Sequence, residues 1–169
     1  MTNPGDNPPS GIRRSQSPVL IGELVSAVRA FQRATDDVDE AACDAMGVNR
    51  SDGKCLDVLQ EHEPMTAGAL AEELGLTTGA ITTLLDRLEK AGYVTRTRDT
   101  VDRRRVLVEL TPRARRRIEE LYGPMAEHGR EWFEPLSDDE IRLLTDFMRH
   151  GTKINVDNAA RIRGESSPE

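Results

Sequence analysis

The 169-residue sequence has few aromatic residues, two cysteines and no long hydrophobic run, and each absence excludes a class of protein. Only six residues are aromatic, so the core must consist of Leu, Val, Ile and Ala, which amphipathic helices accommodate better than a β-sandwich does. Cys43 and Cys55 show no CxxC spacing and accompany no signal peptide, which favours a reducing compartment. Since no apolar run approaches the roughly 20 residues that cross a bilayer, we expect a soluble, cytoplasmic protein without a membrane partner.

Motifs of catalysis are also missing. The sequence contains no GxSxG, no GxxxxGK[ST] and no HExxH, which would indicate a nucleophile, a phosphate-binding loop or a catalytic zinc. The acidic run between residues 36 and 40 lies on the polar side of a predicted helix without a histidine, which is typical of a solvated face. We therefore expect no enzyme, no catalytic residues, no cofactor and no metal.

Positive charge is scarce overall but concentrated in one segment. The net charge is −7, which by itself argues against a nucleic-acid partner. Residues 77–117, however, contain 11 basic and 5 acidic residues, whereas the rest of the chain contains 12 basic and 25 acidic ones. Because nucleic-acid binding depends on where positive charge lies, this segment remains a candidate, with a solvated basic face as the alternative.

The first half of the chain shows helical periodicity. Apolar residues recur at spacings of three and four from Pro18 to Met46, which predicts one long amphipathic helix ended by Gly47. Its apolar stripe needs a partner, because a single helix of this length has no reason to be stable alone. A shorter helix is predicted over residues 51–61.

Two further short helices form a helix-turn-helix. Thr66 can cap the first, which Gly75 ends, and Thr77 or Thr78 can cap the second, which Gly92 ends. The link between them is short enough to require a tight turn, which is the arrangement of a helix-turn-helix. Two β-prone runs, 93–98 and 106–110, follow around a polar connector and predict a hairpin with a basic tip. A helix-turn-helix followed by such a hairpin is a winged helix.

Two helices complete the chain. Thr111-Pro112 marks the start of the first, which Pro124 is expected to kink, and Ser137 with Glu140 forms a capping box that opens the second. The fold class is therefore mainly α with a small β-hairpin wing. The expected organisation is a flexible N-terminal arm (1–18), a dimerisation helix (19–50), a winged helix-turn-helix DNA-binding domain (51–111), C-terminal dimerisation helices (112–156) and a flexible tail (157–169).

Candidate DNA-binding residues lie on the second helix of the helix-turn-helix and on the wing. Short threonines near a helix N-terminus can approach base edges in the major groove, and basic residues further along can reach phosphates or a guanine. Adjacent arginines at a hairpin tip repel one another, so folding does not favour them, whereas a thin basic hairpin suits the minor groove. Asp102 can orient a guanidinium by a bidentate pair. The helix candidates are Thr77, Thr78, Gly79, Thr82, Thr83, Arg87 and Lys90, and the wing candidates are Arg98, Asp102, Arg103, Arg104 and Arg105.

These segments resemble the MarR family of transcriptional regulators. The stretch Asp102-Arg-Arg-Arg-Val-Leu-Val-Glu-Leu-Thr111 is similar to that family's wing motif, and Asp86-Arg-Leu-Glu-Lys-Ala-Gly-Tyr-Val94 resembles the exit from its recognition helix. The resemblance implies that Arg104 enters the minor groove with Asp102 as its supporting carboxylate. It further implies a homodimer made by the first and last helices, which binds a pseudo-palindromic operator in double-stranded DNA, most commonly as a repressor.

The resemblance also implies a small-molecule effector, often phenolic or anionic, between the dimer helices and the winged domain. The sequence does not locate its pocket. In some members of the family the sensor is instead a cysteine near the start of the first long helix, which peroxide oxidises. Neither Cys43 nor Cys55 lies there, so buried and inert thiols are the favoured interpretation. Two alternatives stay open, a winged-helix protein-interaction module without specific DNA binding and a thiol-based redox-sensing regulator.

Overall fold

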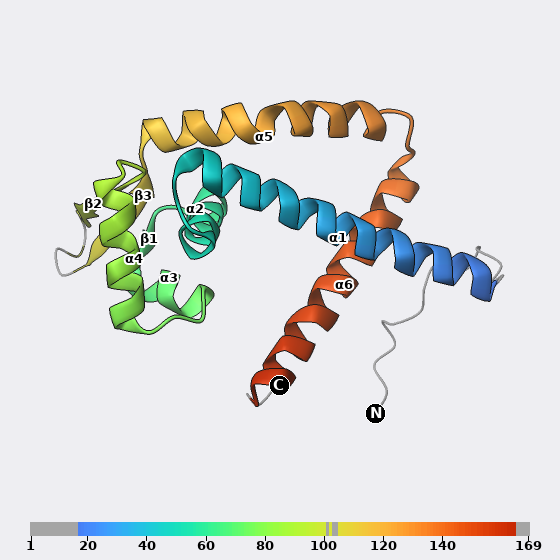
Figure 1. The fold of residues 1–169 in the computed structure, drawn as a ribbon, viewed down its shortest axis with the longest axis horizontal. Helices are drawn as coiled ribbons and strands as arrows, with labels where there is room; N and C mark the ends of the chain where they lie inside the picture. The colour runs from blue at the N-terminus through green and yellow to red at the C-terminus, as the bar shows by residue number, and fades with distance from the viewer. Residues whose placement is uncertain (1–16, 101, 103–104, 165–169) are drawn as a thin grey trace. The chain divides into compact units, whose positions relative to one another are not determined.

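The structure is a computed structural model, and it describes residues 17–100, 102 and 105–164. The chain divides into two compact units, unit 1 (Met1–Arg115) and unit 2 (Arg116–Glu169). Figure 1 shows the order of the elements along the chain. They are α1 (Pro18–Met46), α2 (Arg50–His62), β1 (Met65–Thr66), α3 (Ala67–Glu73), α4 (Thr78–Lys90), β2 (Val94–Arg98), β3 (Val106–Leu110), α5 (Pro112–Phe133) and α6 (Asp138–Arg163).

Helix α1 has the predicted bounds, and its end is set by local chemistry. Gly47 adopts a left-handed φ of 68°, a conformation that glycine enters without a Cβ penalty, and its N–H bonds to the carbonyl of Asp44. Two residues later the Asn49 side chain caps α2 by accepting a hydrogen bond from the Asp52 N–H at 2.9 Å. A Cβ placed on Gly53 would lie 2.5 Å from the Cys43 sulfur, so the two helices pack closely there.

The wing belongs to a three-stranded antiparallel sheet with strand order β1-β3-β2. Strands β2 and β3 pair from Val94 opposite Leu110 to Arg98 opposite Val106, as the predicted hairpin requires. Strand β1 adds Met65 opposite Val108 on the other edge of β3. The sequence did not predict β1, because a two-residue strand is too short to show the alternation by which strands are recognised.

The core of unit 1 lies between helices α2, α3 and α4 and the sheet. The eight largest fully buried side chains among the described residues are Leu59, Leu70, Ile81, Leu84, Leu85, Leu88, Val108 and Cys55. Four of them lie on the face of α4 that the periodicity of the sequence predicts to be buried. Burial of each such side chain stabilises the fold by about 1.5–3 kcal/mol, so this face fixes which side of α4 points outward.

Unit 2 confirms the predicted capping box but not the predicted end of the last helix. The Ser137 hydroxyl accepts from the Glu140 N–H, and the Glu140 carboxylate accepts from the Ser137 N–H at 2.8 Å. The expectation that residues from 157 onward form a flexible tail is wrong up to Arg163, because α6 continues to that residue. Side-chain pairs along the helix, Lys153 with Asp157 and Arg161 with Asn158, support this extension, and Gly164 ends it with a left-handed φ of 75°.

Candidate nucleic-acid interface

The helix-turn-helix consists of α3, a tight turn and α4. Gly75 supplies a positive φ of 62° in the turn, and the Leu76 N–H bonds back to the Ala71 carbonyl. Both helices begin in the same way, since Thr66 caps α3 by accepting from Ala69 N–H and Thr77 caps α4 by accepting from Ala80 N–H. The predicted caps are therefore confirmed, and of the two candidates for α4 the cap is Thr77.

The outward face of α4 carries most of the candidates that the sequence singled out. These exposed residues are Thr77, Thr78, Gly79, Thr82, Thr83 and Lys90. The hydroxyls of Thr82 and Thr83 donate to carbonyls one turn back, at 2.8 and 3.1 Å. Each threonine oxygen therefore keeps its lone pairs as acceptors toward solvent, on a face that the chain's own core does not use.

Arg87 has a different environment from the one expected of a DNA-contacting residue. Its guanidinium donates two hydrogen bonds to the Asp52 carboxylate, from Nη2 to Oδ1 at 2.6 Å and from Nε to Oδ2 at 3.3 Å. Asp52 is buried, and its hydrogen bond to Arg87 is the main cause that raises the pKa of the guanidinium. Arg87 lies on the exposed side of α4, as its spacing predicts, and its contact with DNA stays a prediction. The sequence did not show that Asp52, 35 positions earlier, would lie beside it.

Another arginine, Arg96, joins the wing to α4, and the sequence did not single it out. Arg96, on β2, pairs with Asp86 at 2.7 Å and with Glu89 at 3.5 Å, and it also reaches the carbonyl of Thr82. The Arg96 side chain is only 27% exposed, which strengthens these pairs relative to fully solvated ones. Its alternation within β2 could have indicated an inward-facing side chain, but not its partners.

The described part of the wing tip is held by backbone hydrogen bonds. The Asp99 N–H donates to the Arg105 carbonyl at 3.0 Å, and the Arg105 N–H donates to the Asp102 carbonyl at 2.9 Å. Arg98, Asp102 and Arg105 are exposed. The predicted minor-groove residues Arg103 and Arg104 lie outside the described residues.

The base of the wing is fastened by a second set of polar contacts that the sequence did not indicate. The Tyr93 hydroxyl donates to the Met46 carbonyl at the end of α1, at 2.9 Å, and the Arg113 guanidinium lies 5.1 Å from the centre of the Tyr93 ring. On the other side, the Glu63 carboxylate accepts from the Leu110 N–H at 2.8 Å and pairs with Arg115. These contacts and the Arg96 pairs thus hold helix α4 and the wing in one rigidly connected unit.

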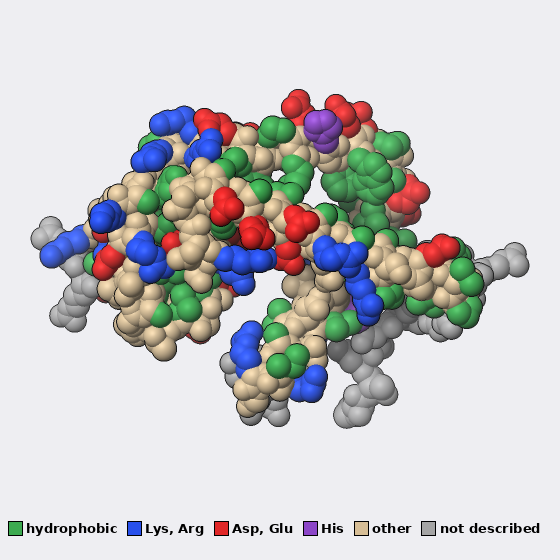
Figure 2. Space-filling model, viewed as in Figure 1, with side chains coloured by type: hydrophobic (Ala, Val, Ile, Leu, Met, Phe, Trp, Pro, Cys, Tyr) green, Lys and Arg blue, Asp and Glu red, His purple; other side chains and the backbone are tan. Residues whose placement is uncertain are grey.

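Basic side chains gather at this end of unit 1. Figure 2 shows Lys and Arg over α4, the sheet and the start of α5, with some Asp and Glu among them, whereas Asp and Glu gather along the C-terminal half of α1. The charge asymmetry predicted from the sequence is therefore also an asymmetry in space within unit 1. An anionic partner is attracted to the first region and repelled from the second.

Comparison with known proteins identifies the family. The sequence model of the MarR family matches residues 48–106, from the residue after Gly47 to the first residue of β3. An uncharacterized HTH-type transcriptional regulator of Bacillus subtilis, YcgE, is 37% identical over 124 residues, which cover 73% of this chain and 80% of that protein. The chain belongs to the MarR family.

Solved structures show the same fold. A Q18P mutant of MepR from S. aureus superposes with a TM-score of 0.63 at 19% identity, over 77% of this chain and 95% of that one. MepR in a crystal structure with DNA superposes with a TM-score of 0.53 at 20% identity, over 74% of this chain and 94% of that one. This MarR-family chain is therefore a winged-helix protein of a family of transcriptional regulators, as its sequence motifs predict.

The two thiols of this MarR-family regulator have environments that keep them protonated. Cys55 is fully buried, and burial, with a smaller contribution from the Asp52 charge, raises its pKa to about 12. Burial and the nearby charge of Asp39 raise the pKa of Cys43. The expected burial is therefore confirmed for Cys55, whereas Cys43 is only half-buried. Since the thiolate is the reactive form, the raised pKa of each thiol supports an inert thiol over a redox sensor.

Two expected absences can be compared with the described residues. Within the ranges that the structure describes, no group of three or more His, Cys, Asp or Glu side chains is arranged to hold a metal ion. In the acidic run of α1, Asp36 instead pairs with Arg50 of α2. None of the described helices combines the length and the apolar character that a membrane span needs.

Proposed function

We propose that this chain is a sequence-specific DNA-binding transcriptional repressor that binds a pseudo-palindromic operator as a homodimer. The observation that carries the proposal is the exposed threonine face of α4, held beside a basic wing by the Arg96 pairs with Asp86 and Glu89. A helix and a hairpin that are fixed to each other can enter adjacent grooves of one duplex.

The proposed division of labour follows the chemistry of each side chain. Thr77, Thr78, Gly79, Thr82 and Thr83 lie toward the start of α4, where short side chains and free backbone N–H groups suit base edges and phosphates. Lys90, at the opposite end of the helix, suits a phosphate. On the wing, Arg98, Asp102 and Arg105, with Arg103 and Arg104 beside them in sequence, suit the negative potential of the minor groove.

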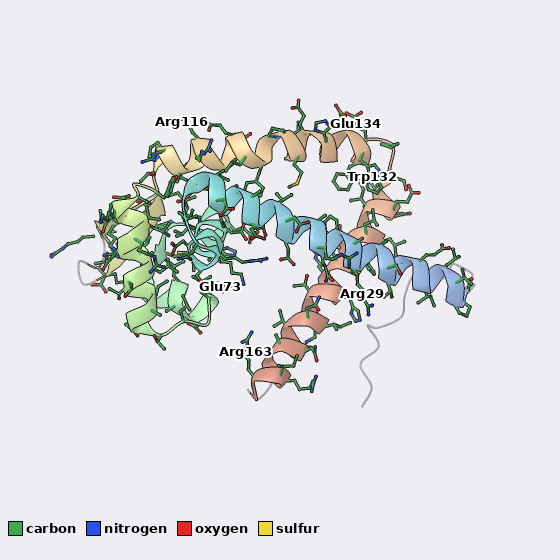
Figure 3. The ribbon with its side chains drawn as sticks, viewed as in Figure 1. Arg29, Glu73, Arg116, Trp132, Glu134 and Arg163 are labelled. Carbon is green, nitrogen blue, oxygen red and sulfur yellow. The ribbon has the colours of Figure 1, made fainter. Side chains whose placement is uncertain are left out.

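A second copy of the chain is the proposed partner of the exposed apolar side chains outside the winged helix. On α1 the large exposed apolar residues are Val19, Leu20, Ile21, Leu24, Val25, Phe31 and Val38. In unit 2 they include Ile141, Leu144, Phe147 and Met148 of α6, with Trp132 and Phe133 of α5. Trp132, labelled in Figure 3, meets Phe133 edge-on at 5.4 Å and is still 61% exposed. Such surface is typical of an obligate interface, so we propose residues 19–50 and 112–156 as the dimerisation region and 51–111 as the DNA-binding domain.

Release from DNA is proposed to depend on a small-molecule effector. The support is the family resemblance together with the raised pKa of both thiols, which favours ligand binding over thiol oxidation as the form of control. An anionic or phenolic compound that lowers operator affinity of the pure protein at fixed salt would support this part. Repression itself predicts that deleting the gene raises transcription from the promoter that contains the operator.

Selection of bound sequences from random DNA tests the central proposal. We expect a recovered palindrome whose half-sites lie about one helical turn apart. Affinity for that sequence should fall by orders of magnitude between about 50 and 200 mM salt, as expected when several phosphates are contacted. A failure to enrich any sequence would favour the protein-interaction module instead. A monomer in sedimentation at micromolar concentration would contradict the dimer.

A further inference from the structure

The ion pair between Asp52 and Arg87 joins α4 to the first turn of α2. Asp52 is the third residue of α2, and its backbone N–H is held by the capping side chain of Asn49. Its side chain is 5% exposed, whereas that of Arg87 is 46% exposed. The carboxylate therefore lies inside the fold, out of reach of any DNA, and the guanidinium reaches inward to it.

The residue that precedes Arg87 in α4 makes a second ion pair, with the wing. Asp86 precedes Arg87 in α4 and pairs with Arg96 of β2 at 2.7 Å. Consecutive residues of an α-helix point about 100° apart, so these two pairs hold α4 from two different directions. One pair fastens the helix to α2 and the other to the wing, and together they restrain both rotation of α4 about its axis and sliding along it.

We propose that Asp52 and Arg87 are positioning residues that set the rotation of α4 for DNA recognition, and that Arg87 acts through Asp52 rather than by contacting DNA. This inference rests on the proposed function. The planar guanidinium offers parallel N–H groups at a fixed spacing, and two of them, on Nη2 and Nε, are committed to the two carboxylate oxygens. A bidentate pair of this kind fixes orientation as well as distance, which a lysine ammonium cannot do.

The test compares four variants with the wild-type dimer, namely Asp52→Asn, Arg87→Lys, Arg87→Gln and the double variant Asp52→Asn/Arg87→Gln. Lys90→Gln is the matched control, because Lys90 is an exposed cation on the same helix. Binding to the selected operator and to a scrambled duplex is measured by fluorescence anisotropy over a series of salt concentrations. All measurements are made at a temperature at which circular dichroism shows each variant to be folded. Asp52→Asn is nearly isosteric and leaves no buried charge unpaired, so of the four variants it should disturb folding least.

The proposal predicts that Asp52→Asn, although it cannot touch DNA, weakens operator binding about tenfold, within the range of coupling between residues in direct contact. Arg87→Lys should lose as much as Arg87→Gln, and the double variant should lose no more than either single variant. Binding to scrambled DNA and the salt dependence should stay close to those of the wild type. Lys90→Gln should instead weaken binding to both duplexes alike and reduce the salt slope by about one.

Opposite results separate the failure of this inference from that of the proposed function. If Arg87 instead contacts a phosphate, Asp52→Asn leaves the operator affinity unchanged or raises it. Arg87→Lys then retains the affinity, and Arg87→Gln reduces the salt slope. Any one of these results overturns the inference while DNA binding stands. If the wild-type protein prefers no sequence over the scrambled duplex, the proposed function fails and this inference fails with it.

Discussion

Gly79 is a residue at which alanine should stabilise the fold but weaken the binding of DNA. It is the second residue of α4, its φ is negative, and a Cβ added there would meet no atom within 4 Å. Nothing in the described fold therefore requires glycine, although glycine in a helix costs about 0.5–1 kcal/mol relative to alanine. The N–H of this residue belongs to the first turn, whose donors have no partner within the helix. If α4 enters the major groove at this end, the missing side chain allows the DNA to approach closely.

We expect Gly79→Ala to stabilise the protein and to weaken its binding to DNA. The gain of about 0.5–1 kcal/mol corresponds to a rise of about 1–4 °C in Tm for a chain of this size. A single poorly fitted contact at a protein–DNA interface costs about 1–3 kcal/mol, so the operator Kd should rise about fivefold or more. Thermal unfolding followed by circular dichroism and anisotropy titration with the selected operator measure the two effects on the same sample.

The chain contains a matched control for this substitution. Gly68 is the second residue of α3, also two positions after a capping threonine, and its added Cβ would meet only the Thr66 hydroxyl at an ordinary 3.9 Å. Gly68→Ala should therefore raise Tm similarly and leave operator affinity nearly unchanged. The reasoning is refuted if Gly79→Ala binds the operator as tightly as the wild type, or if it lowers Tm.

Further predictions concern the wing, Cys55 and Gly92. Arg104→Ala should weaken operator binding by about 1–3 kcal/mol while the dimer sediments and melts as the wild type does, whereas an unchanged gel-shift titration would contradict the assignment of the wing. Cys55, with its pKa raised to about 12 by burial, should not react with a thiol reagent at pH 8 until the protein unfolds, and peroxide should not release DNA. Because this thiol releases its proton more easily in the unfolded chain, it should lower the free energy of unfolding as pH rises from about 9 toward 12, and Cys55→Ala should reduce that pH dependence. Gly92→Ala should destabilise unit 1 by about 1–2 kcal/mol, measured by urea unfolding. Residue 92 has a φ of 75°, and a Cβ there would lie 3.2 Å from the Arg113 guanidinium. An unchanged midpoint of urea unfolding would show that the turn can relax.

Most of the secondary structure of this regulator could be predicted because its signals are local. The end of α1 at Gly47, the cap at Thr77 and the capping box at Ser137 each depend on residues within one helical turn. The two misjudged features have local explanations as well. Strand β1 is two residues long, and from Asp157 onward α6 has a single large apolar residue, Ile162, so neither shows a periodic apolar pattern.

The candidate site could be predicted only as a set of residue types on a face. Helical spacing placed the threonines of α4 opposite its buried leucines, and the structure confirms that they are exposed. The same spacing placed Arg87 with them, but spacing carries no information about which side chain of another helix lies nearby. The role of Arg96 could not be predicted for the same reason, since it depends on ion pairs with Asp86 and Glu89 of α4.

Apart from β1 and the end of α6, the sequence alone therefore determined where the helices and strands begin and end and which face of each is apolar, since caps, turns and periodicity act over a few residues. Tertiary structure decided which arginines point outward and which brace the fold. Asp52 and Arg87 meet only because the buried side chains of α2 and α4 pack into one core, and an ion pair that depends on this packing has no signature in either segment by itself.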